Sequence, residues 1–188
     1  LAWCNDATIY HRLAGELLQG RFPSLFRTPG YPLFLALTGV LTSERAAFAL
    51  VLQMALDAMT AALLAGLAWR LFRDVRAAWL AGLFYAFCPV AIGLPAFVVS
   101  EPLGTFLVVA AMALALVRPS RLMLLAQVAC WFAAVMVRPS FALLPLIVGV
   151  FFVINRELKV RLKHQAVVVG AYLCCLALWV GFNYARSG

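Results

Sequence analysis

Charged side chains are scarce in this chain. Asp, Glu, Lys and Arg make up 12% of its 188 residues, whereas 66% of the residues are hydrophobic. In a soluble domain about a quarter of the residues are charged and about half are apolar. A water-soluble fold of this length could not bury so much apolar surface, so lipid must cover the remainder. The composition therefore predicts an all-α, polytopic transmembrane protein.

Acidic residues are especially few. Seven Asp and Glu stand against 15 Lys and Arg, which gives a net charge of +8. In a soluble protein this excess would indicate a nucleic-acid partner. Here the basic residues lie in short tracts between apolar runs, such as 70–76 and 156–163, which is typical of loops facing lipid headgroups. We therefore expect membrane lipid, and no nucleic acid, among the partners.

The sequence lacks the common catalytic and metal-binding motifs. It contains no Ser/His/Asp or Cys/His triad, no Gly-rich phosphate loop and no Walker motif. The two histidines, His11 and His164, fall on opposite predicted sides of the membrane. The five cysteines have no metal-type spacing and imply no disulfide framework. We predict neither a metal site nor a cofactor.

An initiator Met and a signal-peptide pattern are also missing, since the chain begins Leu1-Ala2-Trp3. We expect a piece of a longer protein with a single membrane domain. Residues 1–32 are the only sizeable stretch that is not membrane-like, and we interpret them as an external (periplasmic) loop. Residues 33–188 are interpreted as a transmembrane helical region.

The external loop contains a predicted amphipathic helix over Ala7–Gln19. Ile9, Leu13 and Leu17 share one face of it. Gly20 is expected to end it. Such a helix lies in the membrane interface and does not cross the bilayer.

The apolar runs after residue 32 predict about six spans. Leu33–Leu41 is too short for a span, which needs about 20 residues, so we expect a short interfacial or re-entrant helix there. The spans are predicted at 46–69, 77–94, 101–117, 122–137, 140–154 and 166–183. Four prolines are expected to break or kink them: Pro89, Pro95, Pro102 and Pro145.

Basic residues divide unequally between the two sides. The loops at 70–76, 118–121 and 156–163 share one predicted side and carry nine Lys and Arg, against six on the other. The positive-inside rule places the nine in the cytoplasm, so Glu101 and Arg138 face the exterior with the first loop. The Ala-, Leu- and Arg-rich composition indicates a multi-pass protein of a bacterial inner membrane.

Asp6 and Tyr10 are the first candidate site residues. Asp6 stands where the amphipathic helix begins, four residues before Tyr10, so the two neighbour each other on one face. Asp6 is either an N-cap or a general base at the membrane–water boundary.

Arg27 precedes a Thr-Pro-Gly-Tyr-Pro segment that ends at Pro32, which predicts a rigid turn. A guanidinium beside such a turn can bind phosphate bidentately. Alternatively, Arg27 and Tyr31 are interfacial anchors at headgroup level.

Three more charged residues lie in or next to predicted spans. Glu101 needs a polar partner or a water-filled cavity at its depth. Arg138 can neutralise either Glu101 or an anionic ligand. Asp57 lies inside an apolar run, one turn from Gln53, and for it we favour a helix–helix hydrogen bond over catalysis.

The order of these residues resembles that of a known enzyme family. The relevant motifs are Asp6-x-x-x-Tyr10, Ala14, Leu17-Leu18-x-Gly20, Arg27–Leu35, Ser100–Leu103, Arg138-Pro-Ser-x-x-Leu-Leu-Pro145 and Asn183-Tyr184-x-x-x-Gly188. They are similar to family 39-type glycosyltransferases of the GT-C fold, which include dolichyl-phosphate-mannose protein mannosyltransferases and bacterial enzymes that modify lipid A with aminoarabinose or galacturonic acid. The resemblance covers the whole chain and rests on order and spacing.

The resemblance implies a GT-C-like transferase that takes a sugar from a polyprenyl- or dolichyl-phosphate donor. The acceptor would be a lipid, a glycan or a protein on the outer face of the membrane. Asp6 would deprotonate the acceptor hydroxyl, which attacks the anomeric carbon with inversion. Arg27 would stabilise the charge on the departing lipid phosphate.

Our hypothesis adds four residues to this site. Arg138 and Tyr31 join Arg27 at the donor phosphate, Glu101 is a catalytic acid that orients the pocket or acceptor, and Tyr10 lines the pocket. Some branches of the family have Glu after the catalytic Asp, but here Ala7 follows Asp6, which leaves a metal-bridging carboxylate pair unsupported.

Two other functions compete with the transferase. A transporter or flippase for a lipid or lipid-linked sugar would fit the intramembrane Asp57 and the proline-broken spans. A non-catalytic membrane scaffold would not need Asp6, Arg27 and Arg138. Polar groups that cluster at the outer boundary favour the enzyme.

Overall fold

The described part of the chain is entirely helical. The computed structural model describes residues 5–21, 28–38, 46–154 and 161–187. Its helices are α1 (Asn5–Leu18), α2 (Gly30–Thr38), α3 (Ala46–Phe72), α4 (Val75–Ala86), α5 (Pro89–Gly93), η1 (Leu94–Ala96), α6 (Glu101–Ala115), α7 (Arg121–Val137), η2 (Pro139–Phe141), α8 (Leu144–Ile154) and α9 (Leu162–Ser187). No strand occurs in these ranges, which confirms the all-α class.

Several helices are apolar enough for a lipid environment. Phe48–Phe72 and Leu162–Arg186 are each long and apolar enough to cross a membrane, and α4 with the segment Pro89–Ala96 makes a third if this bent pair is one span. The shorter helices α6, α7 and η2–α8 are apolar too. The protein is therefore a membrane protein, and each of the six predicted spans coincides with a helix or a bent helix pair.

The prolines act at helix starts. α4 and the segment beginning at Pro89 are bent by 50°, so the predicted break is confirmed there. The predicted break near Pro145 is also present, because η2 ends at Phe141 and α8 begins at Leu144, directly before this proline. For Pro102 the prediction was wrong, because it is the second residue of α6. The first N–H groups of a helix have no intrahelical partner, so a proline costs no hydrogen bond there.

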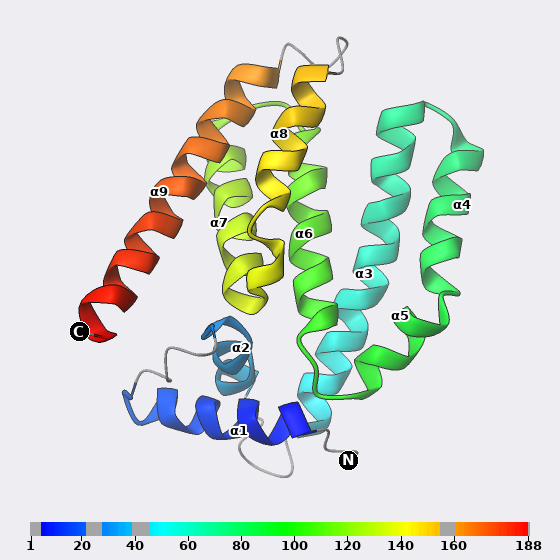
Figure 1. Ribbon diagram of the computed structural model, residues 1–188. Coiled ribbons are helices and arrows are strands. Elements are labelled where there is room, and N and C mark those ends of the chain that lie inside the picture. The colour runs from blue at the N-terminus through cyan, green and yellow to red at the C-terminus, as the bar shows by residue number, and fades with distance from the viewer. Residues whose placement is uncertain (1–4, 22–27, 39–45, 155–160, 188) are drawn as a thin grey trace.

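The helical bundle has two different ends (Figure 1). The α3–α4 turn, the α6–α7 turn and the start of α9 lie at one end, which we call the basic end; its described basic residues are Arg70, Arg73, Arg76, Arg118, Arg121, Arg161 and Lys163. α1 and α2 lie across the opposite end, which we call the α1 end. The three basic loops thus share one end, as predicted, although residues 156–160 are outside the described ranges.

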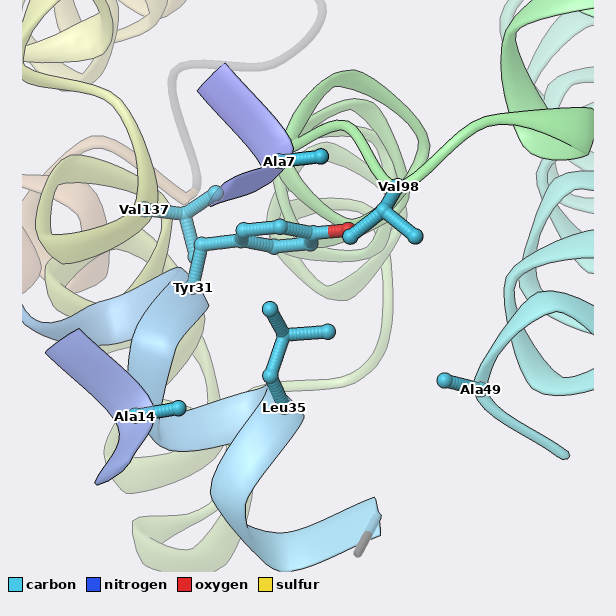
Figure 2. Packing of buried hydrophobic residues seen from close by; sticks show 7 residues of the cluster. All are labelled: Ala7, Ala14, Tyr31, Leu35, Ala49, Val98 and Val137. Atoms are coloured by element: carbon cyan, nitrogen blue, oxygen red, sulfur yellow. The ribbon is translucent and has the colours of Figure 1, made fainter. Parts of the chain in front are cut away.

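At the α1 end, α1 and α2 pack through a small hydrophobic core (Figure 2). Tyr31 and Leu35 of α2 are fully buried against Ala7 and Ala14 of α1. The ring of Tyr31 lies between Val137 and Val98, which brings α2 against the end of α7 and the segment before α6. Alanines allow this close approach because they have no side chain beyond Cβ.

The turn predicted for residues 28–32 does not extend to Pro32. Tyr31 and Pro32 already belong to α2, and the Leu33 N–H donates to the Pro29 carbonyl at 2.9 Å. A proline fits in the first turn of a helix, so this segment starts a helix and does not terminate in a loop.

The amphipathic helix lies close to its predicted position. α1 runs from Asn5 to Leu18, and Gly20 follows with φ of 73°, a left-handed conformation that ends helices. On the predicted apolar face, Leu13 is buried as expected, whereas Ile9 and Leu17 are partly buried. Since α1 begins at Asn5, the backbone of Asp6 lies inside its first turn; its side chain, on which the interpretation as an N-cap depends, lies outside the described residues.

Polar side chains inside the bundle are paired. Tyr85 of α4 donates a 2.7 Å hydrogen bond to Asp57 of α3, which confirms the predicted helix–helix hydrogen bond. Gln127 of α7 and Gln165 of α9 exchange amide hydrogen bonds at 2.9 and 3.4 Å, and both are buried. Such pairs satisfy polar groups that lipid cannot hydrate.

Candidate functional site

Glu101 begins the site at the α1 end. It is the first residue of α6, directly after the buried Ser100 and before Pro102. A carboxylate in the first turn interacts favourably with the positive end of the helix dipole. The start of α6 therefore holds Glu101 at a helix end, out of the apolar middle of the bundle.

Arg138 reaches the same point from α7. It caps the C-terminus of this helix in an extended conformation (φ −144°, ψ 112°), as expected for a residue before proline. Its Nη1 lies 2.6 Å from Glu101 Oε1, and the two side chains are 36% and 35% exposed. Arg138 therefore pairs with Glu101, one of its two predicted partners, and both charged groups stay accessible from outside the bundle.

Gly104 makes room for this ion pair. A Cβ at this position would lie 2.8 Å from Cε2 of Phe141 and 3.6 Å from Cδ of Arg138. The corner between α7 and η2 therefore packs directly on the α6 backbone, one turn after Glu101. The sequence contained no signal for this role, because a glycine in an apolar helix has many possible reasons.

The hydroxyl of Tyr31 is hydrogen-bonded to Gln53 of α3. Its hydroxyl donates to Gln53 Oε1 at 2.7 Å, and Gln53 Nε2 donates to the Phe97 carbonyl at 3.1 Å. Gln53 is fully buried. This chain of hydrogen bonds ties α2 to α3 and to the segment that leads to Glu101, so the predicted phosphate ligand Tyr31 is already engaged within the fold.

The environment of Tyr31 keeps its phenol protonated. Burial raises the pKa of Tyr31 above its usual range, and the neighbouring Tyr10 and Glu101 raise it further. The rings of Tyr10 and Tyr31 meet edge to face with centroids 4.8 Å apart. Tyr10, the predicted pocket residue, thus packs on Tyr31, close to the Glu101–Arg138 pair.

The two residues with the main predicted roles are only partly described. The backbone of Asp6 lies in the first turn of α1, but its side chain is outside the described part of the structure, as is all of Arg27. The next residue, Ala7, packs in the same cluster as Val98 and Val137. Since Val137 precedes Arg138 directly, the start of α1 lies at the same end of the bundle as the ion pair.

Neither a metal-ligand cluster among the described residues nor a known relative gives further information on the site. Within the described ranges, no group of three or more His, Cys, Asp or Glu residues could hold a metal ion. Comparison with protein-family models, curated proteins and solved structures finds no match.

Besides Gly104, sequence reasoning missed two residues that shape the site. Gln53 was noted only as a neighbour of Asp57, although a lone amide in an apolar run signals a buried hydrogen bond. Gly30 contacts the last turn of α7, where a Cβ would lie 2.5 Å from the Met136 carbonyl carbon. No sequence pattern marks such a contact between helices.

Proposed function

We propose that this protein is a membrane glycosyltransferase that takes a sugar from a polyprenyl-phosphate donor at its α1 end. The partly exposed Glu101–Arg138 pair is the observation that carries the proposal. It supplies a cation and a carboxylate beside the cluster that anchors α1 and α2. The motif order from Asp6 to Asn183 supports the same class.

The proposed reaction uses Asp6 as general base. Asp6 takes the proton of the acceptor hydroxyl, whose oxygen attacks the anomeric carbon of the sugar with inversion. The bond between that carbon and the phosphate oxygen breaks, and the lipid phosphate leaves with the electron pair. A cation near this phosphate stabilises the developing charge.

Arg27 and Arg138 are the proposed phosphate ligands. A guanidinium has five N–H donors, so Arg138 can hold Glu101 through Nη1 and still bind phosphate oxygens. Arg27 stands three residues before Gly30, which contacts the last turn of α7. Glu101 keeps Arg138 in place and orients the acceptor, and Tyr31 acts by positioning α2.

The proposal includes a GT-C-like arrangement of about six spans with α1 as an interfacial helix. The basic end would face the cytoplasm and the α1 end the periplasm of a bacterial inner membrane. The acceptor is a lipid, glycan or protein on the outer face. A flippase has less support, because the intramembrane Asp57 has a structural partner in Tyr85.

The test is transfer of radiolabelled sugar from polyprenyl-phosphate donors to membrane acceptors by the full-length protein. We expect Asp6→Asn to fold and to lose transfer, because the amide cannot accept the proton. Glu16→Gln is the matched control, since it makes the same change of carboxylate to amide at a surface pair on α1 and should leave transfer unchanged.

Other outcomes separate the alternatives. Full activity of Asp6→Asn would refute the general base but keep the enzyme. Protein-dependent movement of lipid across the bilayer, with no product from any donor, would establish the transporter instead.

A further inference from the structure

A hydrocarbon-lined groove lies between α3, α6 and α8, away from the site at the α1 end. It has a volume of about 260 Å³ and is partly open. Leu67 and Leu71 of α3, Met112 and Ala115 of α6, and Phe151 and Phe152 of α8 contribute to its walls. Every residue that lines it is apolar. α3 and α6 diverge toward the basic end of the bundle (Figure 1). The lining residues Leu71 and Ala115 lie near the ends of these two helices there.

Water is a poor occupant of this groove. A buried water needs two to four polar partners, and the lining side chains supply none. An empty groove would also forfeit dispersion contacts along its walls. In a bilayer, the abundant molecule that fits an apolar groove is a lipid hydrocarbon chain.

One end of the groove is cationic. Arg161 donates from Nη1 to the Ala115 carbonyl at 3.3 Å and to the Val117 carbonyl. Ala115 also lines the groove, so this guanidinium stands at the groove's end. Arg118 follows Val117 directly and is exposed. Among the described residues, neither Arg118 nor Arg161 forms an ion pair with an acidic side chain. Two neighbouring cations favour the binding of an anionic headgroup there.

We propose that this groove binds one acyl chain of an anionic phospholipid, whose phosphate is held by Arg161 and Arg118. The site lies at the basic end, opposite to the proposed sugar-donor site, and does not depend on the proposed transferase activity. The Arg161 side chain then has two roles: it caps the carbonyl end of α6, and it binds the headgroup through its remaining N–H donors.

The test is lipid binding to the purified full-length protein in a neutral detergent. Phosphatidylglycerol and phosphatidylcholine with identical chains are titrated separately, and the thermal unfolding midpoint gives an apparent Kd for each. We expect phosphatidylglycerol to bind about tenfold more tightly, because each arginine near a headgroup favours an anionic lipid. Each variant is compared with its own lipid-free midpoint, so a general loss of stability does not affect the result.

Three variants separate the groove from its charged end. Arg161→Gln should abolish the preference for phosphatidylglycerol, and Arg118→Gln, which keeps the bonds from Arg161 to α6, should reduce it. Arg186→Gln makes the same charge change at the other end of α9 and should leave the preference intact. Val148→Phe adds volume to the groove wall and should weaken both lipids.

Three results would overturn the proposal. The first is an unchanged phosphatidylglycerol preference in both Arg161→Gln and Arg118→Gln. The second is equal lipid binding by wild type and Val148→Phe. The third is no lipid binding at all, which would mean that another part of the protein fills the groove.

Discussion

At the residue scale, Gly30 decides how closely α2 approaches α7 at the α1 end. A Cβ on Gly30 would meet the main chain of α7, at 2.5 Å from the Met136 carbonyl oxygen and 2.7 Å from the Val137 nitrogen. Main-chain atoms in a helix cannot turn aside as a flexible side chain can. Gly30 therefore sets the distance between α2 and α7, next to Arg138.

Gly30→Ala should destabilise the protein by about 1–3 kcal/mol, the usual cost of overpacking. Denaturation in mixed micelles would measure it. Gly15→Ala is the control, because a Cβ there meets nothing within 4 Å, and Ala is favoured over Gly in a helix by about 1 kcal/mol. Equal effects of the two substitutions would contradict a special role for Gly30.

The ion pair of Glu101 and Arg138 should matter more to function than to stability. Both side chains are about one-third exposed, and ion pairs at exposed sites are worth about 0–1 kcal/mol. Glu101→Gln should therefore cost at most about 1 kcal/mol of unfolding free energy but strongly reduce sugar transfer. A large loss of stability with full transfer would show that the pair is structural.

At the element scale, Gln53 links three segments that are distant in the sequence. It accepts the hydroxyl of Tyr31 in α2, stands on α3 and donates to the carbonyl of Phe97. Its full burial makes these hydrogen bonds hard to replace with water. The position of α2, and of α1 packed on it, relative to Glu101 therefore depends on one amide.

Gln53→Leu should cost about 1–3 kcal/mol, because it leaves buried polar groups of Tyr31 and Phe97 without partners. Tyr31→Phe removes one of those groups. The double variant should therefore lose less stability than the sum of the two single variants, with a coupling of about 0.5–3 kcal/mol. Strict additivity, measured by denaturation of all four proteins, would contradict the link.

At the scale of the whole molecule, the two ends of the bundle differ in charge and in structure. Basic turns occupy one end, and α1 and α2 cover the other (Figure 1). The positive-inside rule predicts that the α1 end faces outward. The proposed transferase requires the same orientation, since its acceptor lies outside.

Thiol labelling in intact cells measures this orientation. In a background whose native cysteines are replaced, Gln19→Cys reports on the α1 end and Pro119→Cys on the basic end; both positions are exposed. A membrane-impermeant reagent should label position 19 in intact cells and position 119 only after permeabilisation. The reverse pattern would place the proposed site in the cytoplasm.

Much of the helical architecture was predictable from local sequence. Lipid requires each spanning segment to satisfy its own backbone hydrogen bonds, so apolar runs become helices almost wherever they occur. Gly20 and Pro89 marked ends and breaks for local steric reasons. The error at Pro102 arose because a proline interrupts a helix in its middle but fits at its start.

The sequence by itself determined the membrane class, the helix positions and the candidate charges at the boundary. Only the tertiary structure decided which of these groups meet. Glu101 and Arg138 are 37 residues apart and Tyr31 and Gln53 are 22 apart, so their pairing depends on how α2, α3, α6 and α7 pack. Packing depends on close approach at Gly30 and Gly104, and such long-range complementarity leaves no periodic pattern in the chain.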